Sequence, residues 1–238
     1  MLRAIATISL AAFVLGGCAA AKATPSQAIL GDGATRLDVP RPTTGRAVAC
    51  APALSTTETI PERVKAFRKI GLFADRTDVT DAQLGTEIET AMTEAWGDQL
   101  KTDDPLMDLF VAEGDGARVW WQDLESDVVT ENQIYAGVLE DWAHISVGAF
   151  RPTAMSETWA GDTGPITVGF ELDGVRHELH PEYLDDWIDP RIATPINDLI
   201  APSGRRFEFF KAFDQTAYVM ALTQGERAML EARGWCFE

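Results

Sequence analysis

Apolar residues recur every three or four positions in several parts of the chain, which is the spacing of one buried helix face. Residues 61–70 form the first such segment, with Pro61 suited to a helix start and Gly71 to a helix end. A second helix is predicted from Thr80 or Asp81, and its buried positions are Leu84, Ile88, Met92 and Trp96. A third is predicted over 131–146 from Ile134, Val138, Trp142 and Ile145.

Capping boxes mark two of the expected helix starts. Thr130-Glu131-Asn132-Gln133 precedes the helix over 131–146, and Thr223-Gln224-Gly225-Glu226 opens a last helix that ends at Gly234. Proline also initiates two short predicted helices, near 181–188 and 195–201.

Strand patterns occur between these helices and pair locally. Residues 106–124 predict two strands around the turn Glu113–Gly116, residues 205–223 predict a second hairpin, and Asp173-Gly174 is the turn of a third. Residues 150–165 are predicted to be a loop-rich connection. Locally paired strands with helices clustered around them favour an α+β fold, with a single globular domain over 59–238.

The hairpin around Asp173-Gly174 contains the sequence His-Glu-Leu-His, residues 177–180, which must be weighed as a metal site. The turn pairs Phe170 with His177 and Thr167 with His180. Because side chains alternate along a strand, His177 and His180 are predicted to point to opposite faces. A helical zinc motif would need the HExxH spacing. We therefore expect His177 to pack on Phe170 and predict no metal or cofactor here.

The other candidate catalytic and metal-binding motifs also lack residues that their chemistry requires. His144 falls on the outer side of its predicted helix. Asp162-Thr163-Gly164 resembles the catalytic triplet of aspartic proteases, but those enzymes need two such aspartates and this chain has one copy. Asp123, Glu125 and Asp127 are spaced like calcium ligands, yet Val128 and Ile134 stand where an EF-hand needs Gly and Glu. No catalytic residue is predicted.

The N-terminus gives the most specific signal. Residues 1–17 have Arg3 near the start, a short apolar run and small residues at the end, which is the layout of a signal peptide. Leu15-Gly16-Gly17-Cys18 resembles the lipobox of bacterial lipoproteins, and this implies lipidation of Cys18. Ala19 rather than Asp after the cysteine favours the outer membrane over the inner one. In the alternative, cleavage after Ala21-Lys22-Ala23 releases a soluble periplasmic protein.

Residues 18–58 are predicted to be a lipidated N-terminus followed by a flexible tether, since prolines and small residues interrupt any apolar periodicity. With Cys18 lipidated, Cys50 and Cys236 remain in an exported chain, which favours a disulfide between them. Two unpaired thiols are the alternative.

The net charge of −17 argues against nucleic-acid binding and would suit a basic protein partner. The sequence therefore predicts a membrane-anchored envelope lipoprotein whose acidic domain is a non-catalytic binding module, for example an immunity-like or inhibitor protein. One alternative is an envelope hydrolase whose active site assembles only in the fold. The other is a structural or assembly lipoprotein.

Overall fold

The computed structural model describes residues 33–39, 54, 57–97, 106–211 and 215–237. These residues form six α-helices and seven strands, and they confirm the α+β class. The α-helices are α1 (Ile60–Ile70), α2 (Asp81–Trp96), α3 (Met107–Glu113), α4 (Ile134–Ile145), α5 (Ala193–Ile200) and α6 (Gln224–Ala232). The strands are β1 (Thr35–Leu37), β2 (Trp120–Asp123), β3 (Thr153–Trp159), β4 (Ile166–Leu172), β5 (Val175–Leu179), β6 (Arg205–Lys211) and β7 (Thr216–Thr223). Short 3₁₀ turns, η2 (Pro190–Ile192) and η3 (Ala201–Ser203), flank α5.

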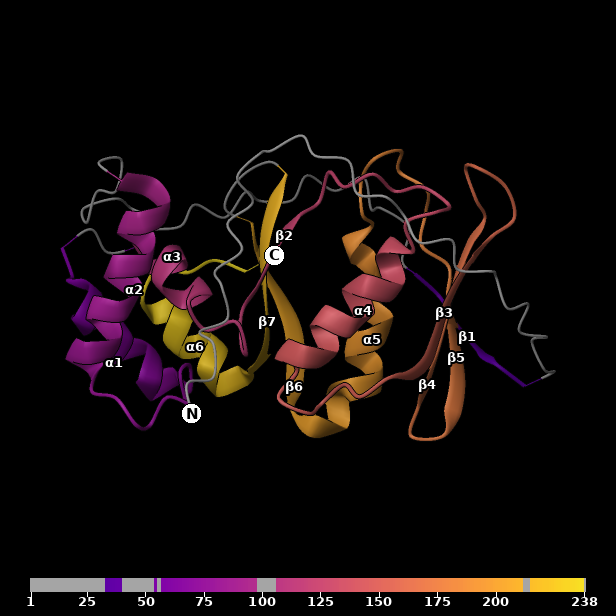
Figure 1. Ribbon diagram of the computed structural model, residues 1–238. Helices are drawn as coiled ribbons and strands as arrows, with labels where there is room; N and C mark the ends of the chain where they lie inside the picture. The colour runs from indigo at the N-terminus through magenta and orange to yellow at the C-terminus, as the bar shows by residue number, and fades with distance from the viewer. Residues whose placement is uncertain (1–32, 40–53, 55–56, 98–105, 212–214, 238) are drawn as a thin grey trace.

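The elements stack in four layers (Figure 1). Helices α1, α2, α3 and α6 cover one face of a three-stranded sheet of order β2-β7-β6. Helices α4 and α5 lie between the other face of that sheet and a four-stranded sheet of order β1-β5-β4-β3. Strand β1 pairs parallel to β5, so Thr35–Leu37, inside the predicted tether, is part of this sheet.

Strand β7 is the centre of the molecule. Its residues from Thr216 to Leu222 are all buried, because both faces of the strand are covered. Val219 and its alternate neighbours face the core around α4 and α5, whereas Tyr218 and Met220 face the core around α1 and α3. The nearly continuous apolar run of β7 is therefore the signature of a strand buried on two sides.

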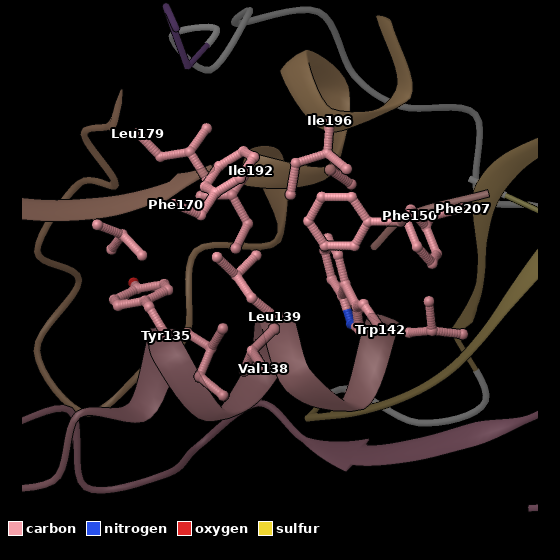
Figure 2. Close-up of a cluster of buried hydrophobic side chains, with 14 of the residues drawn as sticks. Tyr135, Val138, Leu139, Trp142, Phe150, Phe170, Leu179, Ile192, Ile196 and Phe207 are labelled. Carbon is pink, nitrogen blue, oxygen red and sulfur yellow. The ribbon is translucent and has the colours of Figure 1, made fainter. Parts of the chain in front are cut away.

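The core around α4 joins the two sheets. Phe150 is fully buried, and its ring contacts Phe170 of β4 at 5.6 Å between centroids and Phe207 of β6 at 6.0 Å. Trp142 of α4 packs on the other side of Phe207 at 5.0 Å (Figure 2). Aromatic packing thus fixes the distance between the sheets through the helix layer.

Three predicted elements are confirmed with their register. Helix α1 begins at Ile60 with Thr59 as its N-cap and ends at Gly71, which has φ of +92°. The β4–β5 hairpin pairs Phe170 with His177, as the turn at Asp173-Gly174 predicts. Helix α6 starts with the predicted capping box, in which the Thr223 hydroxyl accepts a hydrogen bond from the backbone N–H of Glu226.

The hairpin predicted over 106–124 is wrong. Residues Met107–Glu113 form α3, and β2 pairs instead with β7 in antiparallel register, with Trp120 opposite Val219. A short apolar run does not distinguish a strand from a buried helix by periodicity. Here the helix places Asp108 and Leu109 in the interior, where Asp108 meets arginines from α1 and the C-terminal segment.

The predicted start of α4 is also wrong. Gln133 has φ of +53° and precedes the helix, which begins at Ile134. The first free N–H groups, those of Tyr135 and Ala136, donate to the carboxylate of Glu157 on β3, at 2.9 and 3.1 Å. A distant buried side chain therefore caps the helix in place of the local capping box.

Two further predictions between 150 and 190 fail. Residues Thr153–Trp159, in the predicted loop, form β3 on the edge of the larger sheet. The helix predicted near 181–188 is absent, because the chain turns at Asp185-Asp186 and isolated bridges join Trp187 to Leu184 and to Glu125. The helix predicted near 195–201 is confirmed as α5, which begins two residues earlier.

Candidate functional site

The two histidines of the His-Glu-Leu-His sequence contact different residues. His177 is buried, and its ring packs on Phe170 at 5.4 Å between centroids. Burial lowers the pKa of His177, which favours the neutral ring. His180 lies 3.4 Å from the Thr167 hydroxyl through Nδ1. Across the described residues, His, Cys, Asp and Glu side chains form no group of three that could hold a metal ion.

The other candidates weighed in the sequence occupy separate places. His144 is exposed on α4, and Asp162 lies in an exposed turn between β3 and β4. Asp123 lies at the end of β2, where its carboxylate accepts from the amide of Gln215 at 3.3 Å. Cys18 and Cys50 lie outside the described residues, so lipidation and the disulfide remain predictions. Cys236 is partly buried against the core around α1.

A buried ionic network lies between α1, α3 and the C-terminal segment. The Asp108 carboxylate accepts hydrogen bonds from Arg63 Nη1, from Arg233 Nη2 at 2.9 Å and from the indole of Trp235 at 3.1 Å. Glu58 pairs with Arg233 at 2.6 Å. Every oxygen of Asp108 is satisfied and its side chain is fully buried, so this network supports the fold and offers no surface to a ligand.

Two loops that contact each other are rich in acidic residues. The backbone N–H of Ser126 donates to the carbonyl of Asp186 at 2.6 Å, and Glu125 forms a bridge with Trp187. The two segments contain no lysine or arginine, and their acidic residues are Asp123, Glu125, Asp127 and Glu131 on one and Glu182, Asp185, Asp186 and Asp189 on the other. Asp189 is buried, and both Asp189 and Glu182 pair with Arg191, so the unpaired acidic surface here is smaller than the list of residues. A basic partner stays a prediction.

An open pocket of about 260 Å³ lies between the β2-β7-β6 sheet and the segment formed by η2 and α5. Its apolar wall consists of Leu124, Pro190, Ala193, Phe207, Phe209 and Ala217. Its polar wall consists of Arg191, Thr194, Asn197, Arg206 and Glu208. A second hollow, beside Trp96 and Phe110, has only about 20 Å³ and room for about one water molecule. The larger pocket is the stronger candidate for a ligand site.

The pocket lies beside the contact between α5 and the edge strand β6. The side chain of Asn197 accepts from the backbone N–H of Phe207 at 2.6 Å and donates to its carbonyl at 3.0 Å. These two hydrogen bonds close the groove between α5 and the outer edge of β6 at the position of Phe207. Farther along, the small side chains of Ala193 and Ala217 leave the space open.

The two arginines at the pocket, Arg191 and Arg206, differ in how closely carboxylates pair with them. Arg191 is held by Asp189 at 2.6 Å and Glu182 at 2.7 Å. Arg206 is about half exposed, and its nearest carboxylate oxygen, on Glu208, is 4.0 Å away. Glu208 itself pairs with Arg227 at 2.7 Å. Of the two arginines that line the pocket, Arg206 therefore has the weaker pairing, and its side chain projects with that of Glu208 to the α6 face of the sheet, beside the pocket.

Comparison with known proteins gives no relative: no protein-family model matches the chain, and the curated proteins and solved structures give no significant match. Within the described residues, none of the helices is both long and apolar enough to cross a membrane.

None of the pocket residues was identified from the sequence. The one available signal was Asn197, a polar residue on the otherwise apolar face that Ile196 and Ile200 give to α5. A buried amide needs hydrogen-bond partners, so it marks contact with irregular or edge backbone. Asn197 thus indicates where α5 contacts β6, but it does not indicate that a pocket lies beside this contact.

Proposed function

We propose that the protein is a lipid-anchored binding module of the bacterial envelope and that it holds its ligand in the pocket between α5 and β6. The observation that carries this proposal is the pocket itself, open beside an edge strand and lined by both apolar and polar residues. Binding sites are typically concave and mainly apolar, with a few placed polar groups that fix orientation.

The chemistry of the pocket favours binding over covalent catalysis. Its lining contains neither histidine, cysteine nor serine, and its hydroxyl group, on Thr194, has no partner base within the lining. The acidic members of the wall and its surroundings are paired with arginine, as Glu208 is with Arg227. Such a set can position a ligand through hydrogen bonds and charge, and it supports the non-catalytic reading of the sequence.

Anchoring by Cys18 is the other half of the proposal. It rests on the lipobox-like residues Leu15–Cys18, and it can be tested by intact mass of the chain purified from membranes. We expect a mature N-terminus at Cys18 that carries acyl chains, and loss of membrane retention in Cys18→Ala. An unmodified chain that starts at Thr24 would instead establish cleavage after Ala23 and a soluble protein.

The binding site can be tested in living cells with a photoreactive amino acid. Thr194 is exposed and lines the pocket, and Met229 is exposed on another element, α6. We expect irradiation to give a discrete adduct from position 194 and none from position 229. Absence of any adduct at position 194, or the same adducts at both positions, would remove the pocket as the site.

A further inference from the structure

We infer that the occupant of the pocket is an extended peptide segment that adds to the outer edge of β6 at Phe209, places one large apolar side chain in the pocket, and carries an acidic side chain beside Arg206. This inference rests on the proposed function and names the class of ligand for the same site.

The backbone of β6 supplies the first argument. Because Asn197 takes both the N–H and the C=O of Phe207, these groups point away from β7. In an antiparallel pair the direction of the backbone groups alternates, so Phe209, two residues on, presents its N–H and C=O to the same outer side. The N–H of Arg205, two residues before, donates to the Ser203 hydroxyl at 3.1 Å. Within the described residues, the next N–H and C=O along this edge that have no hydrogen-bond partner are therefore those of Phe209, a residue that lines the pocket.

Unpaired donor and acceptor groups on a strand edge match another extended backbone, which is the basis of binding by strand addition. Side chains of an added strand alternate, so every second one would point into the groove beside α5. At Phe207 the amide of Asn197 already makes the two hydrogen bonds that an added strand would make. The free position is therefore confined to the end of the groove where the pocket opens.

The size of the pocket favours one side chain over a complete small molecule. Its volume of about 260 Å³ lies below the range of about 300–1,000 Å³ that is typical of drug-sized ligand sites. A cavity of about 150 Å³ already holds a benzene ring. The wall formed by Leu124, Ala193 and Ala217 is apolar, so a Leu, Met or Phe side chain is the matching occupant.

Charge adds the last requirement. Although the whole chain is strongly acidic, the available charge at this edge of β6 is the half-exposed guanidinium of Arg206, since Arg191 is already paired with two carboxylates. The Arg206 side chain lies on the α6 face of the sheet, and neighbouring residues of an added strand point to opposite faces. An Asp or Glu next to the apolar residue of the peptide would pair with Arg206. The expected sequence feature is thus a large apolar residue followed or preceded by an acidic one.

The test selects peptides on the full chain, held in detergent micelles, from a displayed library of random heptapeptides. Two variants with the same new side chain provide the comparison: Thr194→Trp at the pocket mouth and Ala228→Trp on the exposed face of α6, each checked for an unchanged circular dichroism spectrum. The best peptide is then synthesised with a fluorescent label, and its affinity is measured by anisotropy. A series in which each backbone nitrogen is methylated in turn tests the strand pairing.

We expect enriched peptides with adjacent apolar and acidic residues. Thr194→Trp should weaken binding at least tenfold and Ala228→Trp less than twofold. Methylation of one particular backbone nitrogen should weaken binding about tenfold, the equivalent of one lost hydrogen bond. Arg206→Gln should weaken it about two- to fivefold, as for an exposed ion pair.

The inference is overturned if no peptide is enriched, if the enriched peptides bind Thr194→Trp as well as the unmodified chain, or if no single methylation weakens binding. In those cases, the adduct formed at Thr194 in cells can still be identified. If it contains a small molecule or a second copy of this chain, the pocket is still a binding site and only the peptide inference fails. Failure of the proposed function is separate, since it would appear as the absence of any adduct at Thr194 in cells.

Discussion

Replacement of Asp108 by Asn should destabilise the protein strongly, because it removes the buried carboxylate charge that Arg63 and Arg233 both contact. The side chains of Asp108 and Arg63 are both fully buried, and Arg233 is only 15% exposed. Removing one partner of a buried ion pair typically costs about 3–5 kcal/mol. Against a total stability of about 5–15 kcal/mol for a folded domain, this is a large fraction.

Urea unfolding followed by circular dichroism measures the loss. With a denaturant dependence of about 2 kcal/mol per molar urea, the midpoint should fall by about 1.5–2.5 M. The matched control is Glu87→Gln, which breaks a 2.6 Å pair with Arg76 whose two side chains are 41% and 34% exposed. That substitution should cost less than about 1 kcal/mol.

The decisive comparison is a variant that removes both charges. Asp108→Leu combined with Arg63→Met leaves Arg233 paired with Glu58, so it should be less destabilised than Asp108→Asn by at least about 1 kcal/mol. If Asp108→Asn lowers the midpoint no more than Glu87→Gln, or if the double variant is the least stable of the three, removal of the Asp108 charge is not the cause of the loss.

Three further predictions concern stability. Glu157→Ala should cost about 2–4 kcal/mol in urea unfolding, because the cap of α4 is lost and two N–H groups lose their acceptor; a loss below about 0.5 kcal/mol would contradict the role of this cap. Glu226→Gln should destabilise the protein at pH 7 but not near pH 3. Burial alone would raise the pKa of Glu226, but hydrogen bonds from the Thr223 backbone and from arginines outweigh it and lower the pKa in the folded protein. The ionised side chain therefore stabilises the fold above its ordinary pKa, and this stabilisation disappears as pH falls through the lowered pKa. A difference that stays constant between pH 3 and 7 would refute this assignment. Cys236→Ser should remove roughly 5 kcal/mol if the predicted disulfide to Cys50 closes its loop of about 185 residues, and alkylation of the unreduced protein should then label neither cysteine; labelling of both would exclude the bridge.

Elements encoded by adjacent residues were predictable, and those decided by distant ones were not. Asp173 and Gly174 have φ of +52° and +78°, so the turn chemistry of two residues sets the register of β4 and β5. The Thr223 capping box succeeds for the same local reason. The box at Thr130–Gln133 has equally good residues but fails, because Glu157 supplies the acceptor from another strand.

The candidate site was beyond sequence reasoning for a related reason. Its wall is built from four separated stretches of chain, which meet only because β7 brings β2 and β6 into one sheet. Ala193 and Ala217 contribute to the pocket because their small side chains leave space. The sequence does not show which of its alanines border such a space in the fold. Arg206 becomes notable only when Glu208 is seen to pair with Arg227.

Packing around β6 indicates that the pocket is formed before any ligand arrives. On one face Phe207 is locked against Phe150 and Trp142, and on the other Phe210 packs against Trp235 at 5.1 Å. Ser203 and Asn197 hold the outer edge by hydrogen bonds to its backbone. An edge strand fixed on both faces and along half of its edge cannot move toward α5 to close the groove, so the gap beside Ala193 has a set width. A ligand that fits it need not order the strand first, and its affinity should therefore depend on the size of the side chain that enters.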